Sequence, residues 1–370
     1  MNHTDTRKGL VMDSVTIYLN TKCNLTCDYC YVRKNNSFID RGRLEKIMRW
    51  FVNQNGPEKF INFLGGEPLL SADLLVGIKD FLHRINPGKK ISIKDIPTNG
   101  IMLNKEMLMC LKEEGIKLSF SLDGVQFRHN KFRIKNKALF DQILRNIELY
   151  KEYYGPPAIK CTVHPALAQD LDKRIGELLK RGFRSIHILP VFGLPWSRTQ
   201  VQSYRDSINK ITRSYLELLK TGNRGIQIHP IKKDIERVLH REFFDNLASC
   251  RLGSEPVFMP DGRAYACKVV MHYNHPQLVE KFSIGHIDTG VDIKKMETFS
   301  KYRLCQDVKT DCRQTTPGSC CRRVCFSYNT RTGKIFSPKD IATMIEIDAV
   351  TFLSVNDALK GHRTFEISRE

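Results

Sequence analysis

The amino-acid sequence predicts an α/β protein in which a partial (β/α)6 barrel is followed by a small cysteine-rich domain. Short apolar, β-branched runs alternate with longer amphipathic runs from residue 15 to about residue 220, as in parallel strands joined by crossover helices. Three cysteines lie within eight residues near the N-terminus, and seven lie between Cys250 and Cys325. After about residue 222 the periodicity is lost, which indicates a small domain stabilised by metal rather than by a large core.

The elements of the barrel can be assigned in order along the chain. Six short β-branched runs are the expected strands: Val15–Leu19, Phe60–Leu64, Ile91–Ile96, Leu118–Leu122, Ile159–Val163 and Ile186–Leu189. Six runs with helical periodicity are the expected helices: Arg43–Val52, Ala72–His83, Lys105–Glu114, Leu139–Glu152, Asp172–Arg181 and Tyr204–Leu219. The expected domains are an N-terminal extension (1–14), the barrel (15–222), a linker or helix (223–248), the cysteine-rich domain (249–330) and a helical tail (331–370) with an amphipathic stretch near Ile341–Leu359.

Composition excludes several classes of protein. The 370 residues are 41% hydrophobic, a globular composition, and no run reaches the roughly 18 apolar residues of a membrane-spanning helix. The polar N-terminus has no signal-peptide core, so we expect a cytoplasmic protein whose twelve cysteines bind metal rather than form disulfides. The net charge of +19 is dispersed, which favours a solvated surface over an anionic partner. Nucleic acid stays open as a partner, although no nucleic-acid-binding motif accompanies the charge.

Polar or glycine-rich segments follow the first four expected strands. They are Cys23, Gly65–Pro68, Thr98–Gly100 and Asp123–Gly124. Because the loops at the C-terminal ends of parallel barrel strands converge, we expect these segments to form one site. The alternative is that their Gly, Asn and Asp residues are ordinary turn residues.

The first cysteine group, Cys23, Cys27 and Cys30, has the spacing C-x3-C-x2-C. Thiolates this close together on one loop suit an iron–sulfur cluster. Three ligands for a four-iron core leave one iron open, and an open position is what a catalytic metal needs. Zinc is the alternative, although no fourth Cys or His lies close by in the sequence.

This triplet, with Tyr29 before its third cysteine, resembles the signature of the radical S-adenosylmethionine (radical SAM) superfamily. The resemblance implies a TIM-like barrel and a [4Fe–4S] cluster whose open iron binds S-adenosylmethionine. It also implies reductive cleavage of S-adenosylmethionine to a 5′-deoxyadenosyl radical, which abstracts hydrogen from a substrate C–H bond.

Three further segments strengthen the resemblance. Gly65–Pro68 resembles the GGEP motif, Thr98–Gly100 resembles the TNG segment, and Ser121–Gly124 with the following His129 and Arg133 resembles the SLDG stretch. The cofactor-binding residues that the resemblance implies are Tyr29, Gly65, Gly66, Glu67, Pro68, Thr98, Asn99, Ser121 and Asp123. The candidates for catalysis are Asp123, His129 and Arg133. Two alternatives stay open: Glu67 as an acid at a helix N-terminus, and Asp123 and His129 as turn and surface residues.

The second cysteine group resembles a SPASM or shorter Twitch domain, because Gly262 and Cys267 form a Gly-x4-Cys pattern. A hairpin turn at Asp261–Gly262 would bring two strands together. The resemblance implies one auxiliary [4Fe–4S] cluster, or two, although the spacing departs from a full SPASM domain and zinc is an alternative. The candidate ligands are Cys250, Cys267 and Cys325 with Cys321 or Cys312, and, as weaker candidates, Cys305 and Cys320. We expect the remaining Cys110 and Cys161 to be buried core thiols.

The resemblance implies an enzyme that modifies a peptide or protein by cross-linking, epimerisation or oxidation. The alternatives are a reaction of a small molecule such as a sugar, nucleic-acid modification, or a non-enzymatic cluster protein. Sulfatase-maturating enzymes place an acidic base where Lys268 follows Cys267, which argues against formylglycine formation by their route. The expected substrate is a peptide or protein, and it is acidic if the cations from Lys131 to Lys137 bind it. An electron donor such as flavodoxin or ferredoxin is a second expected partner. A separate leader-binding protein is the third, since only fourteen residues precede the first strand. No membrane partner is expected.

Overall fold

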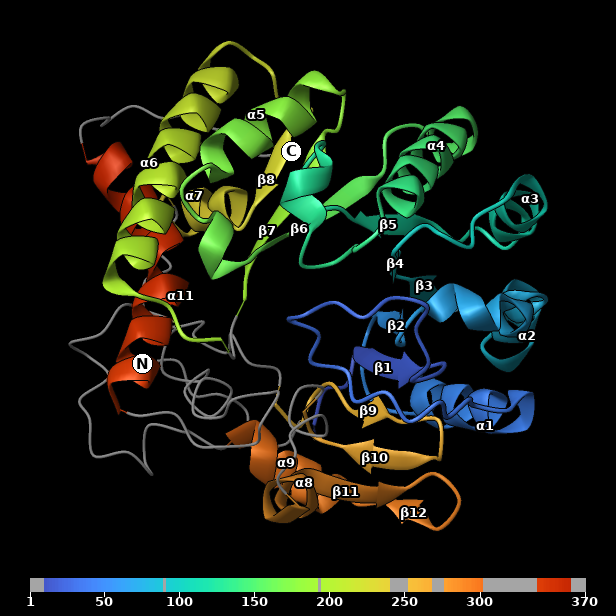
Figure 1. The fold of residues 1–370 in the computed structure, drawn as a ribbon. Helices are drawn as coiled ribbons and strands as arrows, with labels where there is room; N and C mark the ends of the chain where they lie inside the picture. The colour runs from blue at the N-terminus through green and yellow to red at the C-terminus, as the bar shows by residue number, and fades with distance from the viewer. Residues whose placement is uncertain are drawn as a thin grey trace.

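The computed structural model describes residues 10–88, 91–191, 194–239, 252–267, 276–301 and 338–360 (Figure 1). The strands form two sheets, with the orders β12-β11-β10-β9-β1-β2-β3 and β4-β5-β6-β7-β8. The strands are β1 (Ser14–Tyr18), β2 (Lys59–Leu64), β3 (Ile91–Ile93), β4 (Ile96–Thr98), β5 (Leu118–Ser121), β6 (Ala158–Val163), β7 (Ser185–Pro190), β8 (Gln227–His229), β9 (Val257–Phe258), β10 (Arg263–Tyr265), β11 (Ser283–His286) and β12 (Gly290–Val291). The α-helices are α1 (Arg41–Val52), α2 (Ile78–Ile85), α3 (Lys105–Glu113), α4 (Lys137–Tyr154), α5 (Leu171–Lys180), α6 (Arg198–Lys220), α7 (Ile231–Leu239), α8 (Pro276–Phe282), α9 (Ile293–Lys301) and α11 (Pro338–Leu359), and η1 (Pro68–Leu75), η2 (Phe127–Asn130) and η3 (Pro165–Leu167) are 3-10 turns.

The α/β barrel class is confirmed. Strands β1 to β3 pair in parallel, and so do β4 to β8. Helices α1 and α3 begin where the sequence offers a side-chain cap, because Asp40 accepts from the backbone N–H of Arg43 and Asn104 from that of Met107. The buried faces of the helices and the apolar strand residues form one continuous core.

The expected single strand Ile91–Ile96 is wrong, because the chain bends at the exposed Lys94–Asp95. The Lys94 backbone N–H still donates to Ile61 of β2 at 2.9 Å, whereas Ile96 donates to Lys117 beside β5 at 2.9 Å. The run is therefore divided between β3 and β4, one in each sheet. The expected helix Ala72–His83 is also divided, because Gly77 has a left-handed φ of 73° between η1 and α2.

The segment 223–248, expected to be a linker or a helix, contains helix α7 and an additional parallel strand, β8. The hairpin of β9 and β10 has its turn at Pro260–Gly262, and β9 pairs in parallel with β1. The described part of the cysteine-rich segment therefore extends the first barrel sheet. The domain limits given above stay a prediction.

The expected amphipathic stretch near the C-terminus is helix α11, which packs on α6 and α7 (Figure 1). The Ser354 hydroxyl donates to the Thr212 hydroxyl at 3.1 Å, and Arg205 forms an ion pair with Glu346. Across the described part of the chain, no helix combines the length and apolarity needed to cross a bilayer.

Candidate functional site

The loop that carries the first cysteine group lies against the glycines that follow β2. The Gly66 N–H donates to the Asn20 carbonyl at 3.1 Å, and the Glu67 N–H donates to the Lys22 carbonyl at 2.8 Å. A Cβ atom on Gly66 would lie 2.2 Å from the Lys22 oxygen, so only glycine allows the two backbones to approach this closely. The predicted convergence of these two strand ends is confirmed.

Glu67 joins the loop after β2 to the loop after β4. Its carboxylate is buried and accepts from the Thr98 hydroxyl at 2.8 Å, the Asn99 N–H at 2.8 Å and the Leu69 N–H at 3.1 Å. Burial raises the pKa of Glu67, while these donors favour the ionised form and limit the rise. Through the bond to Leu69, Glu67 caps the N-terminus of η1, so the alternative interpretation of Glu67 as an acid at a helix N-terminus also holds. A carboxylate has about four acceptor positions, so an occupied cap leaves capacity for a further donor.

The three thiols of Cys23, Cys27 and Cys30 are free and partly buried on one loop. Burial raises the pKa of Cys23 and raises that of Cys27 to about 11. The Cys23 sulfur accepts from the Leu25 N–H at 3.4 Å and from the Asn99 side-chain amide at 3.9 Å. Three thiol donors on one loop, with N–H groups directed at the sulfur of Cys23, fit an iron–sulfur cluster. Within the described ranges, no three Cys, His, Asp or Glu side chains converge on the position of a single metal ion.

Asp123, after β5, connects the cysteine loop to the second sheet. Its carboxylate accepts from the Tyr29 hydroxyl, from Arg133 Nη2 at 3.1 Å and from the Thr162 N–H at 2.9 Å. Both partners of the Asp123–Arg133 ion pair are buried, and burial raises the pKa of Tyr29 well above its ordinary value. Asp123 and Arg133 are therefore inside the site, and the surface-turn alternative for Asp123 is wrong.

His129 is buried, and its contacts are with Glu177 and Gly124. Its Nδ1 is 4.0 Å from a carboxylate oxygen of Glu177 on α5, and its ring lies against Gly124, where a Cβ atom would be 2.5 Å from Nδ1. Burial lowers its pKa, so the ring is neutral near pH 7. The surface alternative for His129 is wrong, and its contacts here are with α5 and Gly124.

The sequence patterns did not single out Arg174, a fully buried residue of α5. Its guanidinium donates to the Asp123 carbonyl at 2.8 Å and to the Leu167 carbonyl at 2.6 Å. Its position in the sequence could have identified it, because Arg174 has the helical spacing of the buried apolar residues of α5. These are Leu171, Ile175 and Leu178. An arginine on such a face indicates a buried polar partner.

Only part of the second cysteine group lies within the described residues. Cys267, after β10, is partly buried. Burial and then Tyr31 raise the pKa of Tyr18 well above its ordinary value, and Cys30 and Cys267 add smaller contributions. Six candidate ligands lie outside the described residues: Cys250, Cys305, Cys312, Cys320, Cys321 and Cys325, as does Lys268.

The two isolated cysteines differ from each other. Cys161 is buried on β6 as expected, and its thiol donates to the Asp123 carbonyl at 3.6 Å. Cys110 is exposed, so the prediction of a core thiol is wrong there. Helix α3 buries Leu108 and Leu111, and Cys110 points away from that face.

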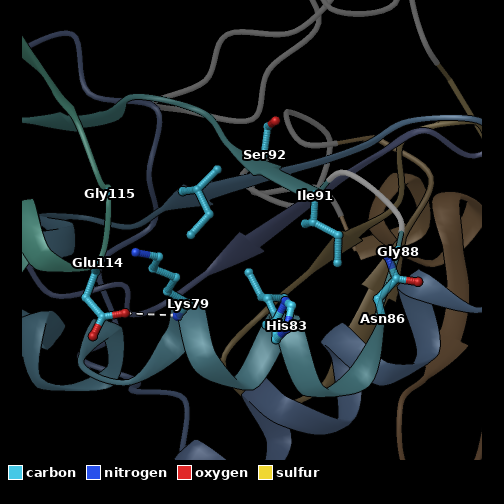
Figure 2. A pocket seen from close by; sticks show the side chains of 10 residues that line it. Lys79, His83, Asn86, Gly88, Ile91, Ser92, Glu114 and Gly115 are labelled. Carbon is cyan, nitrogen blue, oxygen red and sulfur yellow. Dashed lines mark hydrogen bonds between the residues drawn. The ribbon is translucent and has the colours of Figure 1, made fainter.

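A surface cleft of roughly 470 Å³ lies apart from this site, between α2, β3 and the turn after α3 (Figure 2). Lys79 and His83 of α2, together with Ile91 and Ser92 of β3, line it, and the Lys79 N–H donates to Glu114 at 2.9 Å. None of its lining residues is a predicted site residue.

The fold is that of an α/β-barrel enzyme, and the candidate site lies at the C-terminal strand ends beside a three-thiol loop. Residues 17–182 match the family model described as Radical SAM superfamily. The chain is therefore an enzyme that contains a radical SAM domain over these residues, and its cofactors are a [4Fe–4S] cluster and S-adenosylmethionine.

Curated relatives cover most of the chain. A cysteine-type anaerobic sulfatase-maturating enzyme of Clostridium novyi (strain NT) is 25% identical over 72% of this chain and 74% of its own length. A serine-type anaerobic sulfatase-maturating enzyme of Klebsiella aerogenes is 26% identical over 85% of this chain and 83% of its own length. Among solved structures, native anSMEcpe with bound AdoMet and Cp18Cys peptide superposes with a TM-score of 0.70, at 19% identity over 94% of this chain and 99% of the other. This chain therefore has the same overall fold.

Proposed function

We propose that the protein modifies a peptide or protein by radical SAM chemistry. The observation that carries the proposal is the similarity to two sulfatase-maturating enzymes over 72% and 85% of the chain. The neighbour of the same fold was solved with a bound peptide, and the likeness to it spans almost the whole of both chains. Reaction of a small molecule such as a sugar is the competing assignment.

The residues of the first site have distinct roles in this proposal. Cys23, Cys27 and Cys30 would hold the [4Fe–4S] cluster and leave one iron for S-adenosylmethionine. When bound and reduced, the cluster supplies the electron that cleaves S-adenosylmethionine. Gly65 and Gly66 allow the backbone to approach the ligand, and Glu67 has an acceptor position for the amino group of its methionine part.

The remaining predicted residues position or enclose that ligand. Pro68 begins η1 and, with Glu67 as its cap, fixes the direction of the loop after β2. Thr98 and Asn99 hold the Glu67 carboxylate, and Ser121 ends β5 beside Asp123. The ion pair of Asp123 with Arg133 holds the Tyr29 hydroxyl and thereby the cysteine loop. We assign Asp123 and Arg133 to positioning and leave the acid or base of the reaction unassigned.

We further propose an auxiliary [4Fe–4S] cluster on Cys267, with Cys250, Cys325 and either Cys321 or Cys312. The β9–β10 hairpin, which is followed by the partly buried Cys267, supports it. Reduction would come from flavodoxin or ferredoxin, and a separate protein would bind any leader peptide. Because Lys268 follows Cys267, the outcome differs from formylglycine formation by the sulfatase-maturase route.

The test is an anaerobic assay with reconstituted enzyme, reductant and S-adenosylmethionine. The substrates are peptides with and without acidic residues, and a set of sugars. We expect 5′-deoxyadenosine in proportion to a peptide whose mass has changed, and none from the Cys23/Cys27/Cys30→Ala variant. About eight irons per wild-type chain and four in the variant would support one auxiliary cluster. Deoxyadenosine coupled only to sugar conversion would overturn the peptide assignment while leaving the radical chemistry intact.

A further inference from the structure

Three basic side chains lie in one row across the second sheet. Lys160 of β6 is in register with His187 of β7, which is in register with His229 of β8. The two imidazole rings stack with centroids 4.6 Å apart and planes 22° from parallel. All three side chains are partly buried. Parallel strands thus place one ammonium group and two imidazole rings at the same level.

The row lies on the strand face opposite the helix-packed core. The intervening residues of β6 and β7, including Ile159 and Ile186, are fully buried and belong to the same core as the apolar residues of α4, α5 and α6. Since successive strand residues point to opposite faces, Lys160 and His187 face away from that core. The row is therefore directed toward the barrel interior.

The row also lies close to the cofactor half of the site. Thr162 is two residues beyond Lys160, on the same face and about 7 Å further along the strand. Its hydroxyl accepts from Arg133 at 3.1 Å, and Arg133 is paired with Asp123, the acceptor of the Tyr29 hydroxyl. The three basic residues are thus one strand repeat deeper in the barrel than the polar network around the cysteine loop.

The charges around the row are mainly positive. Burial, followed by Lys160 and His229, lowers the pKa of His187 to about 3. Burial also lowers the pKa of His229, and the charges that act on it are Lys232, Lys160 and Lys233, opposed by Glu236. Both rings are therefore neutral near pH 7, and each keeps one N–H donor. The Nε2 atom of His229 also lies 3.4 Å from the Gln227 side-chain oxygen. An anion beside the row would therefore meet the Lys160 ammonium and the His187 N–H in a positive field, and the N–H of His229 as well when the proton is on Nδ1.

We propose that Lys160, His187 and His229 bind a carboxylate of the substrate, which is supplied by an acidic residue or the C-terminus of a peptide. The inference rests on the proposed peptide-modifying function, because that function supplies a substrate rich in carboxylates. In this proposal the acidic group of the substrate is bound in the barrel interior, and not by the surface cations from Lys131 to Lys137. Of those surface cations, Lys135 and Lys137 already pair with Asp28 and Asp141 at 2.6 and 2.7 Å.

The test uses anaerobically reconstituted holoprotein with 13C-labelled histidine, followed by NMR without S-adenosylmethionine or reductant. The probes are N-acetylglutamate N-methylamide, its glutamine counterpart, N-acetylalanine and inorganic phosphate. At neutral pH we expect the glutamate probe to shift the ring resonances of His187 and His229 and the glutamine probe to leave them unchanged. The Lys160→Gln variant should bind the glutamate probe roughly tenfold to a hundredfold more weakly, because a hydrogen bond to a charged group is lost.

The matched control is Lys180→Gln, which removes the same charge from an exposed position on α5 and should bind like wild type. His229→Gln is a second variant and should also weaken binding. A response to N-acetylalanine alone would support a carboxylate site that takes a C-terminus. Equal responses to the glutamate and glutamine probes, or a response to phosphate only, would overturn the proposal. Since nothing in this measurement requires turnover, such a failure is distinct from a failure of the peptide assay.

Discussion

The two sheets of the barrel contribute to the site in different ways. The first sheet supplies loops: the thiols after β1 and the glycines after β2, which need backbone proximity and free sulfur atoms. The second sheet and the segments that follow its strands supply side chains: the buried Asp123, Arg133 and Arg174, and the partly buried row that begins at Lys160. The cofactor residues, and Asp123 with Arg133, belong to short sequence motifs, whereas Arg174 and the row of Lys160, His187 and His229 belong to none. The difference suggests a cofactor half defined locally and a substrate half defined by the fold.

The strongest test of the cofactor half replaces Cys23, Cys27 and Cys30 by Ala. We expect S-adenosylmethionine cleavage to fall to background and about four irons to be lost, because no thiolate remains for the cluster. Iron analysis and 5′-deoxyadenosine assays measure both effects. The exposed Cys110→Ala variant is the control and should keep both. If the triple variant still cleaved S-adenosylmethionine, the cysteine loop would not be the cluster-binding segment.

Asp123→Asn tests the link between the halves. It leaves the buried Arg133 guanidinium without its carboxylate partner, which should cost about 3–5 kcal/mol of unfolding free energy. Denaturant unfolding measures this loss. The control Asp141→Asn breaks an exposed pair with Lys137 at 2.7 Å and should cost about 0–1 kcal/mol. Equal losses of stability in the two variants would contradict the prediction that the buried Asp123–Arg133 ion pair links the two halves of the site.

Gly66→Ala tests the backbone approach in the first sheet. The added Cβ would meet the Lys22 oxygen at 2.2 Å, so we expect about 1–3 kcal/mol of destabilisation and weaker iron retention. Gly176→Ala in α5 is the control, because the added Cβ would point into open space, and it should stabilise the helix by about 0.4–1 kcal/mol. Full iron retention in Gly66→Ala would show that the loop tolerates a shift.

The smallest expected effect concerns pH and the second sheet. The pKa of His187 is lowered to about 3 in the folded protein, against 6.5 ordinarily, chiefly by burial. The unfolded chain therefore binds a proton first, so stability is fully present above about pH 6.5 and falls as the pH drops toward 3. His187→Gln should flatten this slope by less than about 1.4 kcal/mol per pH unit, because the ring is partly exposed. Unfolding at several pH values measures the slope. An unchanged slope in His187→Gln would contradict burial of the ring.

The barrel and its cofactor loops could be predicted from the sequence because their signals are local. Strand β1 and helix α3 agree with the predicted ranges within a residue or two. Gly65–Pro68 and Thr98–Gly100 were expected to lie in one site because both follow barrel strands, and Glu67 does accept from Thr98. Strand β8 was missed because three residues carry too little periodicity to register.

The second half of the site needed the three-dimensional structure. The register that brings His187 beside His229 depends on strand pairing across about 40 residues of intervening chain. Arg174 sits on an apolar helix face, and its partner, the Asp123 carbonyl, is a backbone atom that no sequence pattern marks. Long-range pairings of this kind have no local signature.

The parallel pairing of Thr16 in β1 with Val257 in β9 has a consequence for synthesis of the chain. Roughly 240 residues separate the two, so one edge of the first sheet stays open until β9 has emerged from the ribosome. The cysteine loop begins a few residues beyond that edge strand. During translation, the thiols are thus next to an unpaired strand, and the late addition of β9 covers the edge beside them.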